Sequence, residues 1–334
     1  VRLYRRQVAL IDVAEPGPEP AAGAAGLLLD KDQPAPDSYV FDVVRVAGGA
    51  THTYCFHGPI DDELLVNLEN PVVGAESMEP ADRDYVSRLA FSEEARAGTA
   101  PAVVEATWRF CRGPNVDGTE ERRAAGTEAK LNRAIWNPDS PRKYTRLHVL
   151  GQEGARVLTG HLHCRQWGYR FNNLFVQQRG ETSRESVFPA LIEPYAGEPF
   201  IAARALVAIP GNEDDARRAV AVTVATRNGR TEVCFADGRP EKTRTFQAHG
   251  AAFQIAAEQA FVSTDAEGLR LASLTGGTRL ETPLVALRPA ARERTGRVTR
   301  VDYPTRTLHL DAPWSSAALL KNRVVELGRP GRMT

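Results

Sequence analysis

Residues Leu174–Ile192 read LFVQQRGETSRESVFPALI, and this stretch decides the fold class. Two runs of apolar and β-branched residues, Leu174–Gln178 and Ser186–Ile192, flank a charged connector that contains Gly180. Short apolar runs on either side of a polar, glycine-containing connector are typical of two antiparallel strands joined by a longer loop. We therefore expect a β-hairpin here.

The same rhythm of short apolar runs, bounded by Gly, Pro, Asp or Asn, extends along most of the chain. The other runs that we expect to form strands are Val8–Val13, Ser38–Val46, Thr51–His57, Val103–Arg112, Arg146–Leu150, Ala155–His163, Ile201–Ile209, Ala219–Thr226, Glu232–Ala236, Thr243–His249, Ala251–Ala257, Leu269–Leu274 and Leu284–Leu287. Many short strands at about 8–12-residue spacing indicate an all-β sandwich or barrel. Amphipathic helices do not recur between them, which argues against parallel βαβ units. The expected fold is an all-β, large antiparallel β-sandwich.

Two further connections can be predicted from turn residues. Ser38–Val46 and Thr51–His57 are separated by Gly48-Gly49, which predicts a second hairpin. Near the end, Gly296–Tyr303 and Thr307–Asp311 predict a small hairpin, after a pause in the strand pattern around Pro289. We therefore expect a sandwich domain over residues 1–290 and the start of a small β module, an incomplete one, over residues 291–334.

Composition and charge exclude several classes of protein. Lysine plus arginine and aspartate plus glutamate each number 42, so no net field favours nucleic acid or a membrane surface as a partner. No apolar run reaches about 18 residues, so no membrane span is expected. Walker, G-x-G-x-x-G and G-x-S-x-G motifs are not found. The chain begins Val1-Arg2-Leu3-Tyr4, already strand-like, and we interpret it as the interior of a longer polypeptide.

The four cysteines, Cys55, Cys111, Cys164 and Cys234, are widely spaced. No C-x-x-C pair is present, which excludes a zinc ribbon or a thioredoxin-type motif. Two possibilities stay open: one or two disulfides in an oxidising compartment, or four small buried thiols.

The candidate substrate-binding residues precede the opening stretch. His161 and His163 lie two apart, so on a strand they point to the same face. Such a pair could share a metal if His148 or Asp139 supplied a third ligand, could contact substrate, or could simply lie on a solvent-facing surface.

Arg165, Trp167 and Tyr169 follow the two histidines directly, and Arg170 comes next. An aromatic ring beside a guanidinium suits a uronic acid, because the ring stacks on the sugar and the guanidinium binds its carboxylate. The alternative is that these aromatic residues only anchor a loop.

A second candidate is a proton-transfer pair. His52 and Tyr54 share one face of an expected strand, and a Tyr/His pair is suited to moving a proton at neutral pH. His57 lies five residues from His52 and faces the opposite way. The alternative for these histidines is a structural role.

At this point a combination of local patterns becomes informative. YRRQVALIDV, from Tyr4, followed by SYVFDVVRVAGGATHTYCFHG, from Ser38, resembles the β-sandwich region of the heparinase II/III-like polysaccharide lyases. The positions that carry the resemblance are Tyr4, Arg6, Tyr39, Asp42, Arg45, Val46, Gly48, Gly49, His52, Tyr54, His57 and Gly58. NLFVQQRGE and SVFPALIEPYAGEPFI look like later strands of that family, so the resemblance covers roughly residues 1–290. GRVTRVDYPTRTLHLDAP resembles a small β appendage found in some members.

The resemblance implies a function for a longer protein. Members pair an N-terminal α/α toroid with a C-terminal sandwich and cleave uronate-containing polysaccharides, such as glycosaminoglycans or alginate, by β-elimination. Their main catalytic residues lie on the toroid and in a His-x-His motif, both expected upstream of Val1, so none of the histidines named above inherits a catalytic role. We therefore expect this segment to contribute cleft wall and stability, and to be inactive alone.

Other expectations follow from the same resemblance. The partners would be an acidic polysaccharide and the missing toroid domain, and the location would be periplasmic or secreted. No cofactor is predicted, although a structural zinc or calcium ion in the full-length enzyme stays open. The rival interpretation is a non-catalytic carbohydrate-binding or scaffold β-sandwich.

Overall fold

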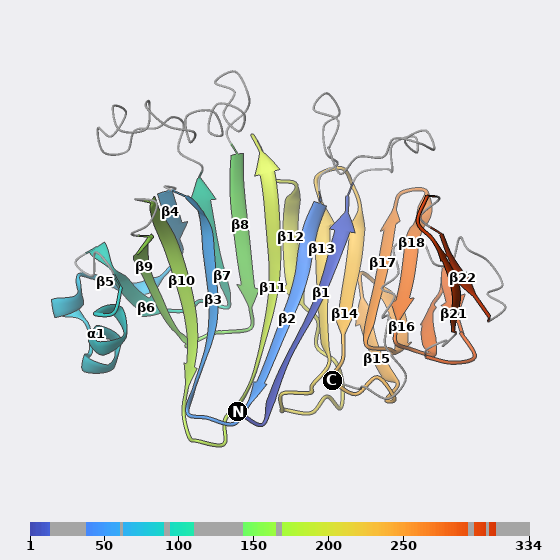
Figure 1. Cartoon of the computed structure of the whole chain (residues 1–334), viewed down its shortest axis with the longest axis horizontal. Helices are drawn as coiled ribbons and strands as arrows, with labels where there is room; N and C mark the ends of the chain where they lie inside the picture. Colours follow the sequence, from blue (N-terminus) through green and yellow to red (C-terminus); the bar gives the residue numbers. More distant parts are fainter. Residues whose placement is uncertain are drawn as a thin grey trace. The chain divides into compact units, whose positions relative to one another are not determined.

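The computed structural model describes residues 1–13, 38–60, 63–89, 94–109, 143–164, 169–292, 297–304 and 307–311. These residues contain 22 strands, one α-helix and one 3-10 helix. The chain divides into two compact units, Val1–Ala290 and Ala291–Thr334. The predicted fold class is confirmed: the chain is all-β, with several antiparallel sheets packed together (Figure 1).

Four sheets, numbered here in the order in which they stack, build the first unit. In hydrogen-bonding order, sheet I contains β3 (Thr51–Ile60), β10 (Tyr169–Arg179), β9 (Arg156–Cys164), β6 (Arg96–Thr99) and β5 (Glu69–Val73). Sheet II contains β1 (Leu3–Asp12), β2 (Ser38–Ala47), β11 (Glu185–Ala196), β8 (Lys143–Leu150), β7 (Val103–Arg109) and β4 (Glu63–Val66). Sheet III contains β12 (Ile201–Leu206), β13 (Val220–Thr226), β14 (Thr231–Ala236), β17 (Gln259–Asp265) and β18 (Gly268–Thr275). Sheet IV contains β15 (Arg244–Ala248), β16 (Ala251–Ala256), β19 (Arg279–Thr282) and β20 (Val285–Leu287).

Separate hydrophobic cores hold these layers together. Trp108 and Phe188 of sheet II pack with Leu174 of sheet I. On its other face, sheet II packs Phe41 and Leu191 against sheet III. Phe235 of sheet III stacks on Phe246 of sheet IV in a third core. The part of sheet II around β2 and β11 is therefore covered on both faces, which explains why these two strands are apolar almost without alternation.

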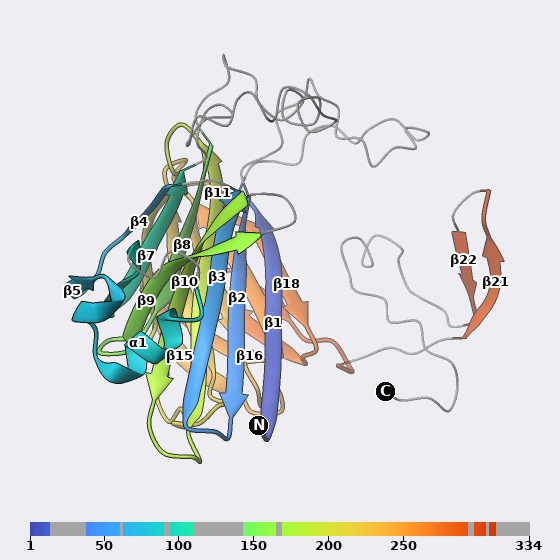
Figure 2. The same cartoon turned by 60° about the vertical axis from the view of Figure 1, so that its left-hand side comes forward.

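The outer face of sheet I is covered by the helical segment η1 (Ala75–Ser77) and α1 (Pro80–Val86) (Figure 2). Val86 packs there against Phe175 and Leu158. Asp82 of α1 is fully buried and accepts hydrogen bonds from Arg156 and Arg179. Because both arginines belong to sheet I, the ion pairs fasten the helix to that sheet.

Both hairpins predicted in the first unit are wrong, although their strands exist. β2 and β11 belong to sheet II, whereas β3 and β10 belong to sheet I, so each connection crosses between layers. β2 pairs with β11 and β3 with β10, which places the two crossings side by side at one end of the sheets (Figure 1). β2 is buried on both faces, so another layer must cover each face of its sheet. The chain therefore crosses from β2 into the covering layer that contains β3, whereas a tight hairpin would have placed β3 beside β2 in the same sheet.

The two crossings bond to each other through backbone groups. The Gly48 N–H donates to Arg184 O at 2.8 Å, and the Gly49 N–H donates to Thr182 O at 2.6 Å. Gly48 and Gly49 have φ values of 86° and 111°, in the left-handed region that favours glycine. The glycine pair thus turns the chain across layers.

The other sequence expectations have mixed outcomes. The remaining predicted strands that fall within the described residues are found, and five strands were missed: β4, β5, β6, β17 and β19. In the second unit β21 (Val298–Asp302) and β22 (Thr307–Leu310) pair antiparallel, so that hairpin is confirmed. Among the described residues, no helix has the length and apolar character that crossing a membrane requires.

Candidate functional site

The predicted substrate-binding residues are only partly visible. His161 lies on β9, with Nε2 2.9 Å from Glu94 Oε2. His163 lies on β9 and Tyr169 on β10, but their side chains are outside the described part, as are Arg165 and Trp167 altogether. Whether these residues form a substrate-facing rim stays a prediction.

The hypothesis that His161 and His163 share a metal required either His148 or Asp139 as a third ligand, and the structure excludes His148. His148 is in sheet II, with its ring nitrogens directed at Glu105 and Glu193, whereas His161 is in sheet I. Asp139 lies outside the described residues. Within the described ranges, no group of three His, Cys, Asp or Glu side chains is placed to hold a metal ion.

The prediction that His52 and Tyr54 act together as a proton-transfer pair is wrong. Both side chains are buried on the same face of β3, as predicted. However, His52 Nδ1 lies 2.8 Å from Ser186 Oγ and Nε2 lies 3.0 Å from Gly48 O, whereas the Tyr54 hydroxyl donates to Asp42 Oδ2 at 3.0 Å. Each group has its own structural partner, so the structural alternative holds for His52.

The cysteine question is resolved for two of the four residues. Cys55 and Cys234 are free thiols, and only Cys234 is buried. Burial raises the pKa of the Cys234 thiol far above its ordinary value, so it is not a nucleophile at neutral pH. Cys111 and the side chain of Cys164 lie outside the described part.

Several residues that carry the lyase resemblance lie in two buried polar networks on opposite faces of β2. On the face toward sheet I, fully buried Asp42 binds Arg6 through two bonds of 2.8 Å and accepts the bond from Tyr54. The resembling residues on this face therefore fasten β1 and β3 to β2.

The second network is centred on Arg45, which faces sheet III and is fully buried. Its guanidinium donates to Gln7 Oε1 and to the carbonyl oxygens of Ala216, Arg218 and Ala236. Burial lowers the pKa of Arg45 to about 10, so the side chain remains charged at neutral pH. Both networks hold strands and layers together, and their central residues Asp42 and Arg45 are fully buried, although Arg6 is half exposed.

A different polar surface lies at the opposite end of sheet II. We call it the polar face; it is formed by side chains of β4, β7, β8 and β11 that point to the sheet III side, namely Glu63, Leu65, Glu105, Thr107, Arg109, Tyr144, Arg146, His148, Glu193 and Tyr195. The strand register arranges them in rows: Glu63, Arg109, Tyr144 and Tyr195 form one row, and Leu65, Thr107, Arg146 and Glu193 form the next. In each row the β4 residue is exposed, whereas the residues of β7, β8 and β11 are half-buried or buried.

The inner part of the polar face is a closed ion network with β12. Glu193 is fully buried; its Oε1 accepts the backbone N–H groups of Phe200 and Ile201 at 2.7 Å each. Arg146 donates to Glu193 Oε2 at 2.7 Å and to Ile201 O at 2.8 Å. These bonds fasten the first residues of sheet III onto sheet II.

His148 and Glu105 extend this network outward. His148 is fully buried, with Nδ1 3.4 Å from Glu105 Oε2 and Nε2 3.7 Å from Glu193 Oε2. Glu105 also pairs with Arg204 of β12, and its side chain is 31% exposed. The ion network therefore reaches solvent at Glu105.

Two carboxylates of the polar face, Glu105 and Glu193, are poor proton acceptors. His148, Arg204 and Arg146 lower the pKa of Glu105 to about 2. Burial by itself raises the pKa of Glu193, but His148, the Ile201 N–H and Arg146 outweigh burial and lower it. A general base works best with a pKa near the operating pH. These two carboxylates are therefore suited to holding charge in place and not to proton transfer.

The outer part of the polar face carries aromatic and cationic groups together. Tyr144 stacks on Tyr195 with ring centroids 4.9 Å apart and an interplanar angle of 11°. The guanidinium of Arg146 lies 5.9 Å from the Tyr195 centroid. Arg109, beside Tyr144, pairs with Glu63, and both side chains are partly exposed, at 38% and 45%. This combination suits the binding of a polar ligand.

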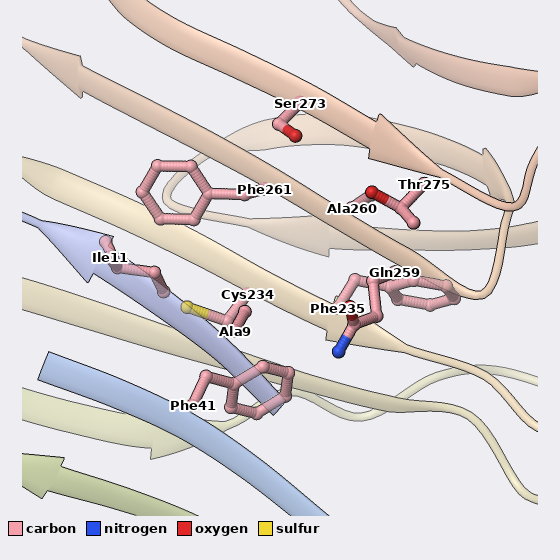
Figure 3. Close-up of a pocket in the computed structure, with 10 residues that line it drawn as sticks. All are labelled: Ala9, Ile11, Phe41, Cys234, Phe235, Gln259, Ala260, Phe261, Ser273 and Thr275. Atoms are coloured by element: carbon pink, nitrogen blue, oxygen red, sulfur yellow. The ribbon is translucent and has the colours of Figure 1, made fainter. Parts of the chain in front are cut away.

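A cavity lies elsewhere in the first unit, between sheets II and III. It has a volume of about 60 Å³ and is lined by side chains of β1, β2, β14, β17 and β18, including Phe41, Cys234 and Phe261 (Figure 3). Small-molecule sites usually measure roughly 300–1,000 Å³. The cavity is therefore too small for a sugar and is a packing feature.

Sequence reasoning missed the polar face because its residues come from strands far apart in the chain. A signal was present: Glu105, Thr107 and Arg109 alternate with apolar residues, and Tyr144, Arg146 and His148 likewise lie two residues apart, so each set shares one face of its strand. Only the pairing of β7, β8 and β11 in sheet II brings these sets of side chains onto one surface. Comparison with known proteins adds no family: a scan against protein-family models finds no match for this chain, and a search of curated proteins finds none either.

Proposed function

We propose that this chain is the β-sandwich portion of a polysaccharide lyase that cleaves uronic-acid-containing polymers by β-elimination. In this proposal the sandwich acts with an α/α-toroid domain, forms one wall of the substrate cleft and stabilises the enzyme, while the toroid carries the main catalytic residues. The substrates would be acidic polysaccharides such as glycosaminoglycans or alginate, and the location periplasmic or secreted. A zinc or calcium ion in the full-length enzyme stays an open part of the proposal.

One observation carries this proposal. Positions that carry the lyase resemblance, among them Arg6, Asp42, Arg45, His52 and Tyr54, form buried or part-buried hydrogen bonds that join neighbouring strands and layers of the sandwich. They therefore belong to one structural unit. That supports the resemblance as one of a whole domain, and the function is inferred from the resemblance.

The pKa values of three described side chains agree with a sandwich that does not itself remove the proton. A lyase must remove a proton from the carbon beside the uronate carboxylate and stabilise the charge that develops. Burial raises the pKa of Tyr54 well above its ordinary value and that of Tyr195 to about 12. Glu105, with a pKa of about 2, is also unsuited to accept that proton.

The test compares two proteins: the chain alone and the product of the complete reading frame that contains it. Each is incubated with glycosaminoglycan and alginate substrates, and unsaturated uronate ends are followed by their ultraviolet absorbance. We expect elimination by the complete product and none by the chain alone. Elimination by the chain alone would refute the division of roles, and its absence from both proteins on all uronate polymers would refute the lyase function.

A second candidate is a non-catalytic carbohydrate-binding sandwich, and the aromatic and cationic outer part of the polar face favours it. The same experiment distinguishes the two. A complete product that binds acidic polysaccharide without producing unsaturated ends would support the binding module.

A further inference from the structure

Arg109 and Tyr144 are directly paired neighbours at the exposed end of the polar face. We infer that these two side chains form a subsite for one acidic sugar residue, with the Arg109 guanidinium on its carboxylate and the Tyr144 ring against its apolar face. The inference deepens the proposed function and rests on it for the choice of ligand. It differs from the sequence-based candidates His161, His163 and Tyr169, whose strands belong to sheet I.

Of the two arginines of the polar face, Arg109 has the more exposed side chain and the more exposed carboxylate partner. Its partner Glu63 is itself 45% exposed, and an exposed ion pair contributes only about 0–1 kcal/mol. Arg146 by contrast is 12% exposed and bonded to buried Glu193 and to Ile201 O. A ligand carboxylate can therefore share or displace the Glu63 contact at Arg109, whereas at Arg146 it would have to break a buried network.

Tyr144 is held in a fixed orientation. One ring face is stacked on Tyr195, which in turn has the Arg146 guanidinium over it. A ring fixed by its neighbours loses little conformational entropy when a ligand binds. The subsite thus has a rigid aromatic side that needs no rearrangement.

The spacing of the two groups matches one sugar ring. Directly opposed side chains on antiparallel strands have Cβ atoms about 4.5–5.5 Å apart. Arg109 and Tyr144 form such a pair, so a sugar resting on the tyrosine places a ring substituent within reach of the guanidinium. Guanidinium groups bind carboxylates in a two-bond geometry, and this geometry favours a uronate over a neutral sugar.

The aromatic half of the subsite distinguishes a sugar from a simple anion. Phosphate or sulfate would use Arg109 alone and gain nothing from Tyr144, because they lack an apolar face to stack on it. The chain has equal numbers of acidic and basic residues, so it carries no net charge that would attract anions to the molecule as a whole. Binding that depends on both residues would therefore identify an acidic sugar.

The experiment measures binding of a uronic-acid hexasaccharide to the complete reading-frame product by calorimetry, with the carboxyl-reduced hexasaccharide as the matched neutral ligand. Arg109→Gln and Tyr144→Ala are compared with wild type, with Tyr144→Phe keeping the ring and Arg270→Gln altering an exposed arginine on β18. We expect each of the first two substitutions to weaken uronate binding about 10-fold. Tyr144→Phe and Arg270→Gln should stay within about 2-fold of wild type, and the reduced ligand should be insensitive to Arg109→Gln.

The outcomes separate the subsite from the proposed function. If wild type binds the uronate ligand and both variants bind equally well, the subsite is refuted while the proposed function stands. If wild type binds no uronate oligosaccharide, both the proposed function and the subsite are refuted. Thermal unfolding of each variant checks that a loss of binding does not come from a loss of fold, and Tyr144→Phe provides the ring-preserving comparison.

Discussion

At the β1–β2 end of sheet II, Asp42 and Arg45 are completely buried and bonded to neighbouring strands and layers, whereas at the β4–β7 end Glu63 and Arg109 pair with each other in contact with solvent. Removing a charge from water costs several kcal/mol unless its partners replace the lost hydration. The buried charges are therefore fixed by the fold, and their partners cannot be exchanged. The exposed pair contributes little to stability, which leaves it free to meet a ligand.

The largest expected effect is at Arg45. Replacement by Met leaves the carbonyl oxygens of Ala216, Arg218 and Ala236 buried without this donor, and should lower the free energy of unfolding by about 3–5 kcal/mol. Urea denaturation measures the change. Arg5→Met, at the paired position on β1, is the control and should cost less than about 1 kcal/mol because its partner Glu258 is half exposed. Equal losses would contradict the contrast between buried and partly exposed charges.

Asp42→Asn should cost somewhat less. The amide keeps the shape of the side chain but weakens the two charged bonds from Arg6 and the bond from Tyr54, for a loss of about 2–3 kcal/mol in the free energy of unfolding. Asp12→Asn, at an exposed position of β1, should change it by less than about 0.5 kcal/mol. An unchanged denaturation midpoint for Asp42→Asn would show that this network does not hold the layers.

Glu105 should contribute a pH-dependent stability. Its pKa is lowered from 4.5 to about 2 in the folded state, so its contribution is present above the unfolded-state value and is lost as the pH falls from about 4.5 to about 2. After allowance for solvent screening the contribution is roughly 1–2 kcal/mol. Glu105→Gln should therefore be less stable than wild type by this amount at neutral pH, and the difference should shrink in acid.

The measurement for Glu105 is the denaturation midpoint as a function of pH. Glu69→Gln, an exposed carboxylate on β5, is the control and should differ little from wild type at any pH. A Glu105→Gln difference that stays constant down to about pH 2 would rule out the expected linkage.

The smallest expected effect on stability is at Arg109. Arg109→Gln breaks only the partly exposed pair with Glu63 and should change the free energy of unfolding by less than about 1 kcal/mol, less still at high salt. Arg146→Gln, on the same face, should cost clearly more because Glu193 and Ile201 O lose a buried donor. Similar costs for both would mean that the outer end of the polar face is as rigidly held as the inner end.

Much of the strand content could be predicted from local sequence, but the sheet assignment could not. The runs Leu174–Gln178 and Ser186–Ile192 do form strands, yet their connector crosses between sheets I and II. Turn residues such as Gly48-Gly49 allow either a hairpin or a crossing. The choice depends on which faces the finished structure covers, and this information lies in strands that are distant in sequence.

The same division applies to the candidate sites. Substrate binding was predicted at His161–Tyr169 because histidine, arginine and aromatic residues cluster in this one segment. The polar face instead draws Glu105, Arg146 and Glu193 from three strands that only sheet pairing brings together. Local density in sequence is therefore a poor guide to a surface assembled from many short strands.

By itself, the sequence determined that this protein is all-β, because short apolar runs bounded by turn residues favour strands wherever they lie. β2 and β11 read as apolar almost throughout, but their place between two covering layers is seen only in the tertiary structure. Only the tertiary structure decided that Asp42 and Arg45 bond toward opposite layers while half-buried Arg109 and Tyr144 become direct neighbours across two strands. The physical reason is that pairing register and layer order set which side chains are neighbours and which are excluded from water, and neither is encoded within a single run of residues.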